Sequence, residues 1–153
     1  ITKLALLREP GPLDAQTLLR VVHDSARYDL FDLGDAALAG DAARALHVLQ
    51  GLVGEGTAEP LLLWVLAREI RRLAAIADAQ ARRQNLAAVF NAQQVWESRQ
   101  GMMLAAAKRL PRERLWLLLL ACAQADLIIK GQLAGDAGLV LAEIVQGLSG
   151  DAK

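Results

Sequence analysis

Apolar residues recur every three or four positions along most of the chain, which is the spacing that places them on one face of an α-helix. The longest such stretch runs from Pro60 to about Arg83. Pro60 suits the first turn of a helix, because the N–H that proline lacks is not needed there. The stretch therefore predicts a long helix with one continuous apolar seam, formed by Leu63, Leu66, Ile70, Leu73 and Ala77.

Acidic residues stand directly before several other apolar stretches, where a carboxylate can accept hydrogen bonds from the first N–H groups of a helix. Asp14 precedes "AQTLLRVVHDSA", Asp41 precedes "AARALHVLQGLV", and Asp136 precedes the last stretch. Another helix is expected in "YDLFDLGDAALAG" and should end at Gly40. The last helix is expected to bury Leu139, Val140, Ile144 and Leu148.

The segment 112–131 is the most apolar part of the chain. Its centre, "LWLLLLACA", is hydrophobic on almost every side of a helix, which is typical of a helix surrounded by protein. We expect it to be the central buried helix, with Cys122 as a small buried hydrophobe. Trp64 and Trp116 lie within apolar helices and are expected in the core. The longest apolar run has 11 residues, fewer than the roughly 20 that a membrane-spanning helix needs.

Composition agrees with a helical fold. Of the 153 residues, 54% are hydrophobic and 4% are aromatic, and the strong helix formers Ala and Leu dominate. We predict an all-α protein in which residues 28–153 form a bundle of about five to six helices. Residues 1–27 include the Pro/Gly-rich stretch "REPGP" and are expected to be the end of a preceding domain. Since the chain begins with Ile, we also expect it to be a fragment that lacks its N-terminal part.

Charge is balanced over the whole chain but not along it. The chain has 17 basic and 17 acidic residues, so its net charge is zero. Residues 68–114 carry ten basic and four acidic residues, a local balance of +6. One interpretation is a set of solvated helix faces. The other is a surface that meets an acidic partner or a phosphate backbone.

The sequence carries no pattern typical of catalysis or metal binding. His23 and His47 lie on predicted helices, without a matched nucleophile motif and without clustered metal ligands. No glycine-rich loop of the GxxxxGK[ST] type is present to bind phosphates. We therefore expect no catalysis by this chain alone, no metal and no cofactor. The single cysteine excludes an internal disulfide and suits a reducing, cytoplasmic compartment.

The stretch "VWESRQGMM", residues 95–103, differs from its Ala- and Leu-rich surroundings. It lies where a short irregular segment meets a helix predicted over 98–110. Two interpretations of Trp96 stay open. It can anchor the core at this junction, with Met102 and Met103 packed around it. It can also serve as a platform on which a nucleic-acid base stacks.

Three stretches of the chain, in this order, resemble one protein family. They are "ALAGDAARALHVLQGLVGEGTAEPLLLWVLAREIRRL", "VWESRQGMMLAAAKRL" and "ADLIIKGQ". With their matching spacing, they resemble the C-terminal half of the delta subunits of bacterial DNA polymerase III clamp loaders, from Tyr28 to Ser149. Residues 1–27 are similar to the end of the helical lid domain of those subunits. The resemblance implies a helical collar domain preceded by a short lid remnant.

The resemblance also implies a non-catalytic role in DNA replication. Collar domains of this family join the ATPase (gamma/tau) and delta-prime subunits in a five-membered ring, and the loader places a sliding clamp on primed DNA. The domain that opens the clamp lies upstream of the matched part. Because family aromatics lie where the template strand leaves the loader, Trp96 and Arg99 are candidates for contact with DNA. A second family aromatic corresponds to Leu133 here, which argues against two stacking platforms.

Two other functions fit the same residues. A stand-alone helical adaptor would hold a partner helix in an apolar groove. A small DNA-binding regulator would need a compact helix-turn-helix with a basic recognition helix. Here the basic residues are spread over several predicted elements, which disfavours the regulator. The sequence upstream of this chain would separate an adaptor from a loader subunit.

Overall fold

Seven α-helices, and no strand, make up the part of the chain that the computed structural model describes, residues 29–150. The all-α prediction is confirmed. The expected number of helices was too low because residues 86–92 form a short helix of their own. In chain order the helices are α3 (Leu30–Leu38), α4 (Ala42–Gly54), α5 (Glu59–Ala81), α6 (Leu86–Ala92), α7 (Glu97–Arg109), α8 (Arg112–Ile129) and α9 (Ala137–Ser149).

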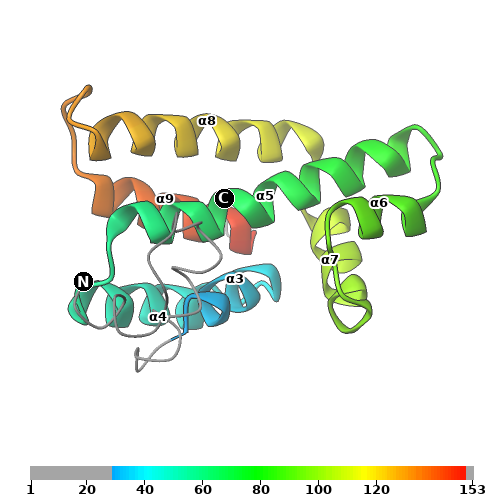
Figure 1. The fold of residues 1–153 in the computed structure, drawn as a ribbon, viewed down its shortest axis with the longest axis horizontal. Coiled ribbons are helices and arrows are strands. Elements are labelled where there is room, and N and C mark those ends of the chain that lie inside the picture. The colour runs from blue at the N-terminus through cyan, green and yellow to red at the C-terminus, as the bar shows by residue number, and fades with distance from the viewer. Residues whose placement is uncertain (1–28, 151–153) are drawn as a thin grey trace, which may run out of the picture.

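The longest helix, α5, passes through the middle of the fold (Figure 1). It contacts α3, α6, α7, α8 and α9. Its predicted apolar seam is confirmed, since Leu66, Ile70 and Leu73 are completely buried. Pro60 lies in the first turn, as expected. Burying side chains of this size stabilises a fold by about 1.5–3 kcal/mol each, so this seam is a main source of stability.

Apart from α8, which packs on α5 and α9, the other helices form two groups. Helices α3 and α9 contact α5 and α4 packs on both of them, whereas α6 and α7 lie at the end of the view opposite to α4 (Figure 1). The predicted caps are present: Asp41 Oδ1 accepts from the N–H of Arg44 at 3.0 Å, and Asp136 Oδ1 accepts from the N–H of Leu139 at 3.3 Å. These caps fix the starts of α4 and α9.

Helix α8 is not the central buried helix that its composition predicts. It packs on α5 and α9, and only one stripe of its surface is covered. Leu115, Leu118, Cys122 and Ala125 form that buried stripe. The expectation for Cys122 is confirmed. The prediction that Trp116 lies in the core is wrong, because its side chain is 68% exposed.

Two further expectations about burial need correction. Trp64 is only partly buried, and the Arg68 guanidinium lies over its ring, 5.0 Å from the ring centroid. Leu139 is 65% exposed on the outer side of α9, although the other three predicted positions of that helix are buried. Leu139 lies in the first turn of α9, where none of the other described helices covers that side.

Residues 1–27 and the helix predicted after Asp14 lie outside the described residues. The predicted domain boundary near Arg27 is therefore not tested by the structure. None of the described helices is long and apolar enough to cross a membrane.

Candidate functional site

The connection between α6 and α7 is a tightly bonded turn. Asn85 caps the start of α6, accepting from the N–H of Ala87 at 2.9 Å. At the other end of α6, Gln94 adopts a left-handed backbone with φ 54°. The next N–H, of Val95, donates to the carbonyl of Phe90 at 2.8 Å. This bond and the burial of both apolar side chains match a Schellman helix end.

Trp96 follows this turn and faces solvent. Its side chain is 77% exposed, so the interpretation of Trp96 as a core anchor is wrong. Met103, one of the two residues expected to surround it, is instead completely buried on the inner side of α7. A shallow hollow of about 340 Å³ lies beside the indole, lined by Phe90, Asn91, Gln94 and Val95. An exposed indole next to a hollow has the shape that a flat ring can stack on.

Arg72, on α5, holds the other side of this turn. The residue is 4% exposed, and its Nε donates to the carbonyl of Gln93 at 3.0 Å. Its Nη2 donates to the carbonyl of Gln94 at 3.3 Å. Burial lowers the pKa of Arg72, and the neighbouring carboxylate of Glu69 partly offsets this effect. Because an arginine stays protonated in proteins, Arg72 brings a buried positive charge to the end of α6.

A chain of ion pairs continues from Arg72 across three helices. Glu69, only 3% exposed, accepts from Arg72 Nη1 at 3.3 Å and from Arg99 Nη1 at 3.4 Å. Arg99 Nη2 in turn donates to Asp35 Oδ1 of α3 at 2.7 Å. The two positive and two negative charges balance. We call these four residues the charge network.

The two predicted DNA-contact residues thus lie close in the chain but in different environments. Trp96 is open to solvent, whereas the Arg99 side chain is 22% exposed and held by carboxylates of α3 and α5. Leu133, the position where the family has a second aromatic, lies in the loop after α8 and is 42% exposed.

The basic excess of residues 68–114 is partly internal. The guanidinium groups of Arg72, Arg99 and Arg109 bond to other parts of the fold. Near the end of α5, Arg82 pairs with Asp78 at 3.0 Å. The charge that is free to attract phosphates is therefore smaller than the sequence indicates.

The outer side of α8 is a second candidate surface. It exposes four large apolar side chains along the helix: Trp116, Leu117, Leu120 and Leu127, the first three with 68%, 59% and 60% of their surface exposed. We call these four residues the α8 apolar face. In Figure 1, α8 lies along one edge of the molecule, with its partners α5 and α9 on one side. An exposed apolar face of this kind is typical of surfaces that contact another molecule.

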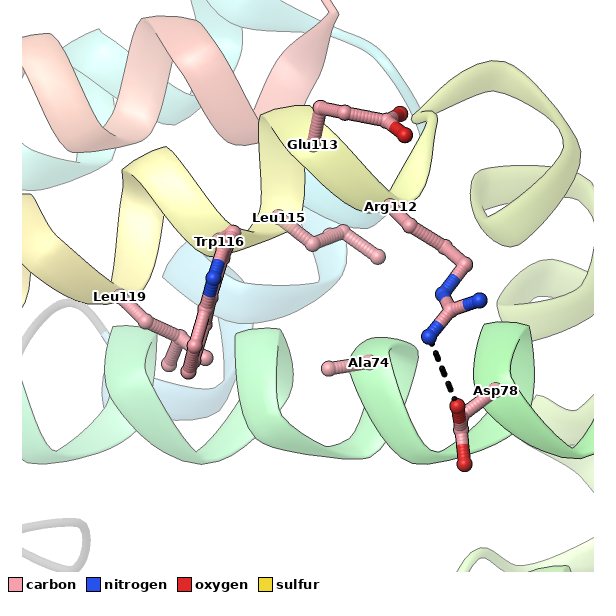
Figure 2. Close-up of a pocket in the computed structure, with 7 residues that line it drawn as sticks. All are labelled: Ala74, Asp78, Arg112, Glu113, Leu115, Trp116 and Leu119. Carbon is pink, nitrogen blue, oxygen red and sulfur yellow. Dashed lines mark hydrogen bonds and ion pairs between the residues drawn. The ribbon is translucent and has the colours of Figure 1, made fainter.

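Between α5 and α8 runs a groove with two hollows, of about 510 and 430 Å³, that share Leu119. Trp116 lies at the edge of the α8 apolar face, and Figure 2 shows that it and Leu119 reach from α8 toward α5 at the first hollow. At its end, Arg112 Nη2 donates to Asp78 Oδ1 at 2.9 Å. The second hollow includes Trp64 and Cys122. The groove can take apolar side chains, and its end is closed by charged ones.

Sequence reasoning missed the charge network and the α8 apolar face. The first had a signal: Glu69 and Arg72 lie beside the apolar seam of α5, where a charge needs a partner. The α8 apolar face also had a signal, because α8 is apolar on almost every side. Such a helix can be covered by another protein as well as by other helices of the same chain.

The described residues hold no group of three or more His, Cys, Asp or Glu side chains that could bind a metal ion. His47 lies on the exposed side of α4, and His23 lies outside the described residues. Burial raises the pKa of the Cys122 thiol to about 11, so it stays protonated at neutral pH and is a poor nucleophile.

Comparison with known proteins gives a family match over almost all of the described residues. A family model described as "Processivity clamp loader gamma complex DNA pol III C-term" matches residues 30–149. DNA polymerase III subunit delta of Escherichia coli (strain K12) is 36% identical over 115 residues, which cover 75% of this chain and 33% of that protein. DNA polymerase III subunit delta of Haemophilus influenzae is 27% identical over 149 residues, covering 92% of this chain and 43% of that protein. The chain therefore spans less than half the length of these relatives.

Proposed function

Since the chain belongs to the family of C-terminal segments of DNA polymerase III clamp-loader delta subunits, we propose that it joins such a subunit to the rest of the loader. In this proposal residues 28–153 are a collar domain and residues 1–27 are the end of a lid domain. The collar packs beside the equivalent domains of the ATPase (gamma/tau) and delta-prime subunits in the cytoplasm. The segment catalyses no reaction itself, and contact with the sliding clamp belongs to the part of the subunit upstream of it.

One observation carries this proposal: the α8 apolar face. Leu117 and Leu120 expose well over half of their surface, on the same side of one helix. Exposure of these apolar side chains to water is unfavourable. A neighbouring helical domain that packed on α8 would remove their surface from solvent and would be stabilised by that burial. The groove between α5 and α8 beside this face gives a neighbour a place for its own apolar side chains.

The test is assembly with purified partners. The chain is mixed with the ATPase and delta-prime subunits of its own organism and separated by size exclusion with mass detection. We expect co-elution, and Leu120→Glu should abolish it because a carboxylate would have to be desolvated in the interface. Val53→Glu is the matched control, since Val53 is 52% exposed on α4, away from α8.

Failure of the unmodified chain to co-elute would favour the adaptor function, in which the α5–α8 groove holds a partner of another kind. Equal loss with both glutamate variants would show that added charge, and not the α8 apolar face, prevents assembly.

We also propose that Trp96 contacts the single-stranded template within the assembled loader. Its 77% exposure supports this role, and stacking of a base on an aromatic ring is worth roughly 1–3 kcal/mol. In the assembled loader, Trp96→Ala should weaken binding to primed DNA with a single-stranded template, whereas Trp96→Phe should retain most of it. Equal affinity of all three proteins would contradict the contact.

Arg99 is proposed as the second contact, directly to phosphate or through the turn that carries Trp96. Its ion pairs with Asp35 and Glu69 favour the indirect route. The salt dependence of the affinity for DNA distinguishes a direct phosphate contact from the indirect route. Loss of one direct phosphate contact in Arg99→Gln would reduce the slope of log affinity against log salt by about 0.7 for single-stranded DNA. An unchanged slope with lower affinity would indicate the indirect route.

A further inference from the structure

We infer that Arg72 is a positioning residue for Trp96: its buried guanidinium holds the carbonyl end of α6, so that the following indole is kept exposed in one orientation. The inference rests on the proposed contact between Trp96 and the template and identifies what prepares it. Arg72 is on α5, 24 positions before Trp96 in the chain, and is itself 4% exposed, so it cannot touch a bound strand.

The geometry of the helix end gives Arg72 this role. The last carbonyls of a helix have no partner within the helix. Two returning N–H groups satisfy earlier carbonyls: Gln94 donates to Asn91 at 3.1 Å, and Val95 donates to Phe90 at 2.8 Å. The carbonyls of Gln93 and Gln94 instead receive the Nε and Nη2 of one guanidinium. The planar fork of arginine can reach two carbonyls at once, whereas a lysine amine is a single point charge.

The turn leaves little freedom to the backbone of Trp96. Val95, directly before it, is buried, and the carbonyl of Trp96 accepts from the N–H of Arg99 at 2.9 Å in the first turn of α7. Arg99 is in turn held by Asp35 and Glu69. The backbone is therefore fixed on both sides of an exposed indole. Ordering a side chain on binding is costly, and a platform that is already ordered avoids much of that cost.

The choice of residue at position 72 also points to positioning. A buried ion pair seldom adds stability over apolar side chains of the same volume. Arg72 and Glu69 lie next to a seam of fully buried leucine and isoleucine, where apolar residues would pack well. What apolar residues cannot do is bond to the carbonyls of Gln93 and Gln94. The guanidinium therefore fixes the orientation of the turn through hydrogen bonds, which apolar packing alone would not do.

The experiment uses the chain with Trp64→Phe and Trp116→Phe, so that Trp96 is the only tryptophan. Time-resolved anisotropy measures the motion of the indole without DNA, and quenching by oligothymidylate at low salt measures stacking. Arg72→Lys keeps the charge beside Glu69 but loses the fork. Compared with the single-tryptophan chain that keeps Arg72, we expect the Arg72→Lys variant to show a larger amplitude of fast indole motion. Its affinity for oligothymidylate should be lower by roughly threefold to tenfold.

A destabilised fold alone must not produce the same result. Arg109→Met provides the control, because Arg109 bonds to the ends of α3 and α9 and not to the α6–α7 turn. It removes one positive charge and lowers stability elsewhere, and a second variant at the turn, Arg72→Met, matches it in the charge removed. We expect it to leave the indole motion unchanged. If Arg72→Met does not fold, Arg72→Lys carries the comparison.

Unchanged indole motion in Arg72→Lys would overturn the inference, and so would an equal increase in Arg109→Met. If the indole motion increases only in the Arg72 variants but oligothymidylate does not quench the single-tryptophan chain with Arg72 intact, the positioning role stands and the chain alone does not stack DNA on Trp96. The Trp96→Ala comparison in the assembled loader then decides the proposed template contact. The two proposals can thus fail independently.

Discussion

Arg109 Nη2 donates to the backbone carbonyl of Leu38 at 3.0 Å and thereby ties the last turn of α7 to the C-terminal end of α3. The same nitrogen lies 3.5 Å from the carbonyl of Leu148, near the end of α9. A cation at the carbonyl ends of two helices is favourable, because both ends carry partial negative charge. Gly150 leaves room for this arrangement, since a Cβ there would stand 2.8 Å from Arg109 Nε.

The first prediction follows from this link. Arg109→Met should lower the free energy of unfolding by about 1–2 kcal/mol, because carbonyls at the ends of α3 and α9 lose a charged donor. Urea unfolding followed by circular dichroism measures the change. Lys108→Met, an exposed neighbour on the same helix, is the control and should change stability by less than about 0.5 kcal/mol. A similar loss in both variants would contradict the link.

Trp96 and Phe90 should differ sharply in their effect on stability, although both are aromatic residues of the same turn. Trp96→Ala should change the free energy of unfolding by less than about 0.5 kcal/mol, because the side chain is mostly exposed. Phe90→Ala should cost about 3–5 kcal/mol, since Phe90 is 5% exposed and leaves a cavity. Denaturant midpoints for both variants test this contrast. A large loss with Trp96→Ala would show that the indole packs on the fold in solution.

Without its partners the chain should associate weakly with itself. Residues 29–150 leave the α8 apolar face exposed to solvent, and apolar patches of this kind favour association. Light scattering over a concentration series should show a rising mean mass, and Leu117→Glu should suppress the rise. Because Leu117 is 59% exposed, that variant should keep the melting temperature of the unmodified chain. A constant monomer mass for the unmodified chain would count against association through α8.

Stability should fall at alkaline pH because of Cys122. Burial raises the pKa of its thiol from an ordinary value of 9.0 to about 11, and the positive charge of Arg71 offsets this slightly. Between these values the folded chain binds more protons than the unfolded chain, so stability decreases as pH rises. We expect a loss of about 1–2 kcal/mol from about pH 8.5 to about pH 10.5, relative to Cys122→Ala. Parallel pH profiles for the two proteins would contradict the shift.

The sequence predicted the helices well where local signals agreed. The spacing of Leu66, Ile70 and Leu73, with a proline at the start, identified α5 and its buried side. Asp41 and Asp136 marked the starts of α4 and α9 because capping depends on residues only three positions away. Such features are set by neighbours in the chain and can be inferred without knowledge of the fold.

Burial on α8 could not be predicted in the same way. The sequence of a helix shows how apolar its surface is, but not how many sides other helices cover. Trp116 is exposed because, within residues 29–150, α8 packs mainly on α5 and α9, and these two helices cover a different side of it. The hydrogen bonds from Arg72 to the turn before Trp96 could not be predicted either. Arg72 and Gln93 are 21 positions apart and come into contact only because α6 folds back on α5. The resemblance to a family indicated Trp96 as a site without this information.

The central place of α5 also sets an order in time. Five other helices pack on it, so its middle turns can open only when most of the fold opens, and their amides should exchange hydrogen most slowly. The α6–α7 turn also receives two hydrogen bonds from a side chain of that helix, so it reaches its final geometry only once α5 is in place. The most exposed tryptophan of the chain is then among the last residues to reach its final position during folding, and its emission would report the completion of folding.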